Sequence, residues 1–359
     1  METRRGGTAL QRWGRLVAMS LVLVAGMNGR AGMAAATSPL NDAWAGDKLD
    51  PKWHLTMMGD AQTEPNEITV QNGTLKIHAG GTEFFSGTDN GLFLWQPANG
   101  DFEAILEVRS ITKISDSLNS SKIGILVRPT LDTHGPDVFC IAMPKGTHLQ
   151  FRPDEGADEG PSSGDAGRLD WGDDTGNGPT MLLRLTRVGD KFTSARSFDN
   201  GKTWGRLHDD AHPETDTVEV KMGDDVLGGI GCSAIHGTSD TTMVDAIVGP
   251  FQFTQTAARP TQNGLFVGTA VDANSKPLDG SFLIVKKGTD VVGTTKTDLV
   301  DGNAETGYSD TASFFLPPGQ YTVEAGETDR NNAGTPVPFE IKTGLDQIQD
   351  LKVPAGKAK

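Results

Sequence analysis

The amino-acid sequence predicts an all-β protein, and two observations support this fold class. Short segments in which apolar and polar residues alternate recur along the chain, for example residues 67–79, 100–110, 180–189 and 216–222. The 45 glycines and 19 prolines interrupt the chain so often that no long stretch sustains a helical period of apolar residues. Alternation between turn residues is typical of half-buried strands, and many short strands at close spacing indicate a sandwich or a barrel.

The N-terminal segment differs from the rest of the chain. Arginines precede the apolar run LVAMSLVLVAG, and small residues ending at Ala36 follow it. This order of basic, apolar and small residues predicts a secretory signal peptide over residues 1–36. The run is shorter than the roughly 20 residues that cross a bilayer, so we expect no membrane span and a secreted or periplasmic protein.

Polar and small residues around Pro260 predict a linker over residues 254–263, between two strand-rich blocks. The blocks are residues 39–253 and 264–354, and neither contains a visible repeat. The formal net charge of -15 disfavours nucleic acid and anionic lipid as partners, because both carry negative charge. Neutral sugars or cations fit better, although the charge could serve only to keep an exported protein soluble.

The two cysteines, Cys140 and Cys232, both lie in apolar runs that read as strands. An oxidising compartment would allow a disulfide between them. The alternative is two buried free thiols, because cysteine packs readily as a small apolar side chain.

The segment SFDNGKTW, residues 197–204, matches the pattern S-x-D-x-G-x-T-W. It resembles the Asp-box of sialidases and related propeller proteins. The pattern predicts a tight turn in which Asp199 and Ser197 bond to turn backbone groups, Gly201 takes a special conformation and Trp204 packs beneath. A sialidase would also need a tyrosine nucleophile in the same block. Both tyrosines lie beyond residue 300, so we interpret the box as a structural brace.

Taken in order, the segments LDPKW, NGTLKI, GDFEAILEVRS, IGILVRP, LLRLTRVGDKFTSARSFDNGKTW and GGIGCSAIHG of the first block resemble the concanavalin A-like lectin/glucanase superfamily, in particular its bacterial secreted branch of unknown function. The resemblance implies a jelly-roll of two antiparallel sheets with a concave face where relatives often bind sugars. In the second block, FVGTAVDANSKPLDGSFLIV, SFFLPPGQYTVEA and PFEIKTG resemble a carboxypeptidase-regulatory-like, transthyretin-type β-sandwich. Such modules are spacers or adhesion units, which implies possible protein partners through this block and no catalysis.

If the arginine-bearing strands adjoin, their side chains could line one ligand face. We predict that this face consists of Arg128, Arg152, Trp171, Arg184, Arg196 and His236. The acidic segment 152–179 could hold Ca²⁺ through the oxygens of Asp170, Asp173 and Asp174, or it could be a solvated loop.

These features favour a non-catalytic binder of a glycan or cell-surface polymer. A structural or adhesive subunit of an envelope or extracellular assembly is the first alternative, and a glycoside-active enzyme with unrecognised carboxylates is the second. Glu103 and Glu107 share a strand face, but four residues at about 3.3 Å each separate them by roughly 13 Å. That separation exceeds the carboxylate spacing of glycosidases, so we expect both to be solvent-facing strand residues.

Overall fold

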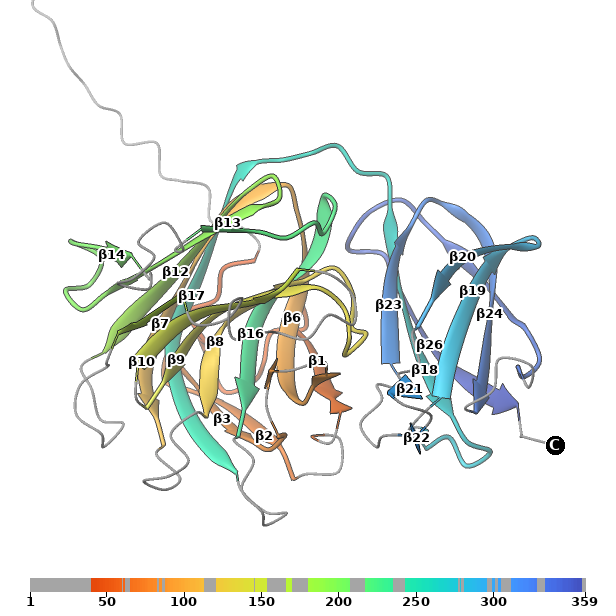
Figure 1. Ribbon diagram of the computed structural model, residues 1–359, viewed down its shortest axis with the longest axis horizontal. Coiled ribbons are helices and arrows are strands. Elements are labelled where there is room, and N and C mark those ends of the chain that lie inside the picture. Colours follow the sequence, from red (N-terminus) through yellow and green to blue (C-terminus); the bar gives the residue numbers. More distant parts are fainter. Residues whose placement is uncertain are drawn as a thin grey trace, which may run out of the picture. The chain divides into compact units, whose positions relative to one another are not determined.

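The structure is a computed structural model that describes residues 40–59, 61, 65–82, 84–85, 88–112, 121–144, 146–153, 166–169, 180–206, 217–234, 243–276, 278, 281–295, 299–300, 303–304, 311–327 and 333–356. Regular structure in these residues is β-strand almost throughout, which confirms the all-β prediction (Figure 1). Within the described residues, no helix has the length and apolar character needed to cross a membrane.

Two antiparallel sheets are built from residues before Arg259. The order in sheet I is β1 (His54–Met58), β6 (Gly91–Asn99), β16 (Asp225–Ser233), β8 (Lys122–Arg128), β9 (Asp137–Met143), β10 (Gly146–Arg152) and β11 (Ala166–Leu169). The order in sheet II is β14 (Gly205–Arg206), β13 (Lys191–Ser197), β12 (Met181–Val188), β7 (Asp101–Ile111), β17 (Val244–Ala257), β3 (Thr74–Ala79) and β2 (Glu67–Gln71), and β15 (Thr217–Glu219) also pairs with β13.

The inner faces of sheets I and II form one apolar core. Alternate residues of β7, such as Leu106, are buried while their neighbours are half-buried, because successive side chains of a strand point to opposite faces. Leu183 of β12 and Val138 of β9 belong to the same cluster. Each fully buried side chain of this size contributes about 1.5–3 kcal/mol to folding.

Sheet III comes from the C-terminal third of the chain. Its order is β20 (Asp290–Thr294), β19 (Ser281–Lys287), β24 (Gly319–Glu327), β26 (Ile348–Gly356), β18 (Gly264–Val271) and β23 (Thr311–Leu316), and β25 (Val337–Ile341) also pairs with β24. β26 runs parallel to both β18 and β24. Two short ladders complete the described strands, namely β4 (Phe84–Phe85) with β5 (Thr88–Asp89) and β21 (Leu299–Val300) with β22 (Asn303–Ala304).

The expected linker is partly regular structure. β17 continues to Ala257, so only residues 258–263 separate it from β18. Side chains tie this connection down: Thr261 and Asn263 both donate to Oδ2 of Asp225, each at 2.8 Å. Residues 38–359 form one compact unit.

Candidate functional site

The structure does not bring the predicted ligand-face arginines onto one surface. Arg128 and Arg152 belong to β8 and β10 of sheet I, and both side chains are fully buried. Arg184 of β12 lies on the outer face of sheet II, where its guanidinium lies 3.8 Å from Glu103. Arg196 pairs with inward-facing Leu183 across β12 and β13, so it points between the sheets. The prediction of a single arginine face is therefore wrong.

Other predicted residues fall outside the described residues. These are Trp171 and His236 of the ligand face and the calcium candidates Asp170, Asp173 and Asp174. Among the residues that the structure does describe, no group of three or more His, Cys, Asp or Glu side chains could hold a metal ion.

The segment SFDNGKTW forms a braced turn after β13. Asp199 accepts hydrogen bonds from the backbone N–H of Thr203 at 2.8 Å and from its hydroxyl at 2.6 Å. Ser197 Oγ donates to Asp199 Oδ1 and accepts from the N–H of Gly201. Gly201 has a φ of 80°, in the region that favours glycine. The hydrogen bonds from Thr203, with that from Ser197, lower the pKa of Asp199 to about 2.

The indole of Trp204 packs against the guanidinium of Arg184. The Arg184 guanidinium lies 4.2 Å from the centroid of the Trp204 ring, within cation–π range. Gly201 packs over the same ring, since a Cβ at this glycine would lie 3.6 Å from it. The contacts of the box therefore hold a hairpin of sheet II together.

Cys140 and Cys232 are free and buried. Cys140 lies opposite Ile125 on β8, and Cys232 lies opposite Ile123 on the other side of the same strand. Two strand spacings of about 4.8 Å therefore separate them, which exceeds the Cα separation of about 7 Å that a disulfide tolerates. The suggested disulfide is absent for this reason. Burial raises the pKa of the Cys140 thiol to about 12, which keeps it protonated.

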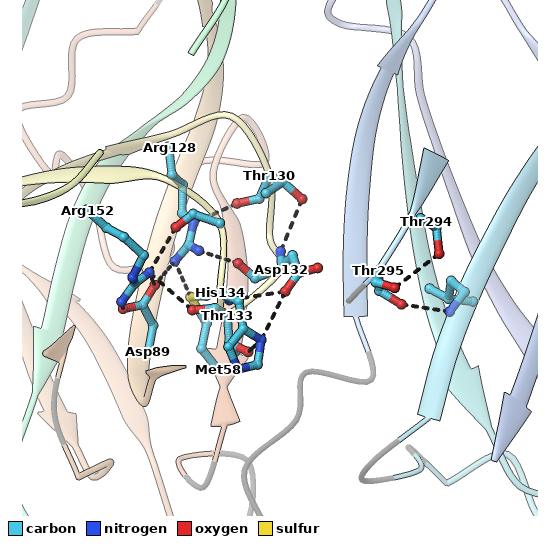
Figure 2. A network of polar contacts seen from close by, with 12 residues as sticks. Met58, Asp89, Arg128, Thr130, Asp132, Thr133, His134, Arg152, Thr294 and Thr295 are labelled. Carbon is cyan, nitrogen blue, oxygen red and sulfur yellow. Dashed lines mark hydrogen bonds and ion pairs between the residues drawn. The ribbon is translucent and has the colours of Figure 1, made fainter. Parts of the chain in front are cut away.

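The two buried arginines of sheet I share one carboxylate. Asp89 accepts from Arg128 Nη1 at 2.8 Å and from Arg152 Nη1 and Nη2 at 3.0 and 2.7 Å (Figure 2). Asp137 accepts from Arg152 Nη1 at 3.0 Å. Burial alone would raise the pKa of Asp89, but the charges of Arg152 and Arg128 lower it below its ordinary value. Burial, followed by the charge of Asp89, raises the pKa of Asp137 to about 7.

The same guanidinium groups hold the connection between β8 and β9, residues 129–136. Arg128 donates to the carbonyl oxygens of Thr130, at 2.6 Å, and of Asp132. Arg152 donates to those of Thr133 and Gly135, at 3.3 and 2.8 Å. Four carbonyl groups of one short connection thus converge on two buried positive charges, which fixes its backbone.

The outer face of sheet I is closed. Its apolar residues form a second buried cluster with residues from other segments: Met58, Phe84, Phe93, Trp95, Leu126, Leu131, Phe139, Ile141, Met143, Leu227, Leu265 and Val267. Leu265 and Val267 belong to β18 of sheet III. Gly231 makes room for this packing, because a Cβ there would lie 2.9 Å from the Phe139 ring. The sequence resemblance implied a concave face open to sugars, and among the described residues the outer face of sheet I offers no such open groove, because other segments cover it.

A pocket of about 540 Å³ lies beside β1. One wall consists of residues His54–Met57 and of Trp95 on β6. In the described part of sheet I, β1 is the outermost strand, so alternate backbone N–H and C=O groups along it point away from the sheet. These groups can donate to or accept from a ligand in the pocket.

The opposite wall is one face of sheet III. Strand register places Thr311, Thr269 and Lys352 in one row across β23, β18 and β26. The next row contains Ser313, Val267 and Asp350, and the third contains Phe315, Leu265 and Ile348. Ser313 is buried and does not line the pocket, so the described lining of this wall offers two hydroxyls, a carboxylate and an ammonium group around apolar side chains.

His54 and Trp95 form the aromatic part of the pocket. Their ring centroids lie 4.6 Å apart in a stacked arrangement, and Trp95 Nε1 donates to Thr56 Oγ1 at 3.0 Å. Burial lowers the pKa of His54, although the nearby Asp350 carboxylate opposes this effect. The imidazole is therefore neutral near pH 7 and has one donor and one acceptor nitrogen.

The pocket does not contain a pair of carboxylates. Among its described lining residues only Asp350 is acidic. Glu103 and Glu107 lie on the outer face of sheet II, as expected, and Glu107 accepts from Arg109 at 2.6 Å. The described residues thus give no support to a glycosidase mechanism, which ordinarily uses two carboxylates across the scissile bond.

A second pocket, of about 610 Å³, lies on sheet II. Glu67, His78 and Asp245 form a row across β2, β3 and β17, and His78 Nδ1 lies 2.7 Å from Asp245 Oδ1. Lys76 and Thr69 also line it. No aromatic side chain other than the imidazole of His78 is among its described lining residues.

No known sequence family matches the chain, and no curated protein matches it either. Several solved structures are similar to it. A functionally unknown protein from Saccharomyces cerevisiae is 16% identical over 58% of this chain and 98% of its own, with a TM-score of 0.39. The GH43 BlXynB protein from Bacillus licheniformis is 14% identical over 61% of this chain and 40% of its own, with a TM-score of 0.40. Arcelin-5, a lectin-like defense protein from Phaseolus vulgaris, is 15% identical over 59% and 95%, with a TM-score of 0.37. All three TM-scores are low, and these likenesses carry no weight for function.

Proposed function

We propose that this chain is an exported, non-catalytic carbohydrate-binding protein, and that the sugar binds in the pocket beside β1. One observation carries the proposal: the pocket places Asp350, Lys352, Thr269 and Thr311 on one wall, opposite His54 and the edge of β1. The sequence resemblance to the concanavalin A-like superfamily agrees with a sugar ligand, although the proposed site lies beside the edge strand of sheet I rather than on a sheet face.

The mixture of groups suits a neutral, hydroxyl-rich ligand. Each sugar hydroxyl can both donate and accept, and the pocket offers acceptors at Asp350, donors at Lys352, and both at the threonines. A carboxylate and an ammonium group in one wall leave it with little net charge, which favours neutral over strongly anionic or cationic ligands. Val267 on one wall and Trp95 on the other add apolar lining that can contact the C–H face of a sugar ring.

The pocket on sheet II fits this function less well. Its His78–Asp245 pair is exposed to solvent, with 40% and 69% of the side chains accessible. Exposed charge pairs contribute little, because water competes for each group. The pocket beside β1 lies between two walls, and its volume falls within the range of about 300–1,000 Å³ that is typical of small-molecule sites.

Calorimetric titration with a panel of neutral, anionic and cationic oligosaccharides tests the proposal. We expect a neutral oligosaccharide to bind, and Asp350→Asn to weaken it about 10-fold or more, because a charged hydrogen-bond acceptor is lost. Asp346→Asn is the matched control, since Asp346 lies in the segment between β25 and β26 and does not line the pocket. Equal binding by Asp350→Asn and the wild type, or no binding to any panel member, would show the proposal to be wrong.

A structural or adhesive subunit is the second candidate, and the closed outer face of sheet I favours it. Packing of Phe93, Leu126 and Phe139 beneath other segments of the chain uses this face for cohesion rather than for a ligand. Sedimentation analysis separates the candidates: concentration-dependent self-association without sugar binding supports the subunit, and a monomer that binds sugar excludes it.

A further inference from the structure

The connection 129–136 contacts the sheet III wall of the pocket region. Thr130 Oγ1 donates to the carbonyl oxygen of Ser313 at 3.0 Å, and the N–H of Leu131 donates to Ser313 Oγ at 2.9 Å. Ser313 lies on β23, two residues from the pocket residue Thr311 and on the same face of sheet III. Leu131 is fully buried in the apolar cluster that contains Val267 of the pocket wall.

The position of this connection depends on the buried charges of sheet I. Its carbonyl groups take four hydrogen bonds from Arg128 and Arg152, and Thr133 O also accepts from the N–H of Asp89 at 3.1 Å. Asp89 in turn holds both guanidinium groups. A hydrogen-bonded path therefore runs from the Asp89 carboxylate through the connection to β23.

We infer that Asp89, Arg128 and Arg152 are positioning residues for the pocket beside β1, because they hold the connection that keeps the β23 wall opposite the β1 wall. The effect that we expect on oligosaccharide binding rests on the proposed function. The effect that we expect on the spacing of the two walls does not. Release of the connection would let the two walls separate and would expose the pocket to water. A lysine at position 128 would keep the charge but lose the planar fork that donates to several acceptors at once.

The titration of His54 reports the spacing of the walls without any ligand. Burial is the main cause of its lowered pKa, and Asp350 on the opposite wall opposes it. Among the described residues that line the pocket, the other charged side chain is that of Lys352. If the walls separate, His54 gains water and its pKa rises toward the ordinary value of 6.5. A residue that only adds stability would leave this titration unchanged in a folded variant.

The experiment follows the His54 ring proton by NMR from pH 5 to pH 8 in the wild type and in Arg128→Lys, Ser313→Ala and Ser281→Ala. The His54→Gln spectrum assigns the signal. Ser281→Ala is the matched control, because its hydroxyl also donates to a backbone carbonyl of the C-terminal region, that of Leu278 at 2.8 Å. Ser313→Ala removes a contact of the connection without touching the buried charges, so it carries the test even where Arg128→Lys does not fold.

We expect the pKa of His54 to rise in Arg128→Lys and Ser313→Ala and to stay at the wild-type value in Ser281→Ala. An unchanged pKa in folded Ser313→Ala and Arg128→Lys would overturn the inference. Oligosaccharide affinity is then measured on the same variants and should fall where the pKa rises. A raised pKa of His54 with unchanged oligosaccharide affinity would support the positioning role and would contradict the proposed sugar site.

Discussion

Asp137 provides a quantitative test of the buried charge cluster. It lies beside Asp89, which already accepts from both guanidinium groups, and it has one hydrogen bond from Arg152. Burial and the charge of Asp89 raise its pKa from 3.8 to about 7. Below pH 3.8 the carboxyl is protonated in both the folded and the unfolded chain. Between these two values the unfolded chain loses the proton while the folded chain retains it.

The folded state therefore binds more protons in this window, and its stability falls as pH rises from about 4 to about 7. A shift of one pKa unit corresponds to about 1.4 kcal/mol, so the full loss due to Asp137 is on the order of 4 kcal/mol. Between pH 5 and pH 8 the loss is about 3 kcal/mol, because part of the window lies below pH 5.

Asp137→Asn removes the titrating proton but keeps an oxygen that can accept from Arg152. We expect the free energy of unfolding of the variant, measured by urea titration at pH 5, 6, 7 and 8, to change less with pH than that of the wild type. At pH 8 the variant should equal or exceed the wild type in stability. Asp290→Asn, at an exposed position of β20, is the control and should parallel the wild type.

Two curves that run parallel from pH 5 to pH 8 would refute this reasoning, because they would mean that the Asp137 carboxylate is ionised in the folded state throughout. A variant that is much less stable at pH 8 would lead to the same conclusion. The arginine charges would then outweigh burial at Asp137 as well as at Asp89.

Two further predictions concern the brace and the thiols. Asp199→Ala should lower the melting temperature, since three hydrogen bonds of the turn are lost. The wild type should lose the same stabilisation as pH falls from 3.8 toward 2, because the Asp199 carboxylate becomes protonated. A variant that melts at the wild-type temperature at pH 7 would contradict the role of Asp199 in the turn. Cys140 and Cys232 should react with a thiol reagent only after unfolding, because both are buried and burial raises the pKa of each. Reaction of the native protein within minutes would contradict this prediction and would show that the core opens.

Local patterns predicted much of the fold. Alternation along β7 and β12 identified which residues face the core, and the turn residues of SFDNGKTW predicted the braced turn with its donors and acceptors. In β24 the shared face of Tyr321 and Val323 was also predictable, and both are buried in the core of sheet III. Each of these features depends on neighbours within a few residues, which is why the sequence alone reveals it.

The site was harder to predict, because its residues come from distant segments. The sequence around Arg128, at the end of an apolar strand, is the same whether its face meets water or is covered by other segments. The described covering segments are residues 84–85, 88–89 and 129–136. One feature of the sequence pointed to the pocket residues Asp350 and Lys352. They alternate with Leu351 and Val353, so they share the polar face of a strand. Nothing in that pattern indicates that His54, almost 300 positions away, faces them.

The position of β26 has a consequence for how the chain is made. This last described strand lies between β18 and β24 and pairs in parallel with both, so without it sheet III falls into two separate halves. Pairing of β26 with β18 joins residues some 80 positions apart. The chain therefore loses loop-closure entropy before the stabilising contacts between these strands can form. During synthesis, sheets I and II can assemble while the C-terminal third is still being translated. Sheet III, and with it the second wall of the pocket, has to wait until the strand at residues 348–356 has left the ribosome.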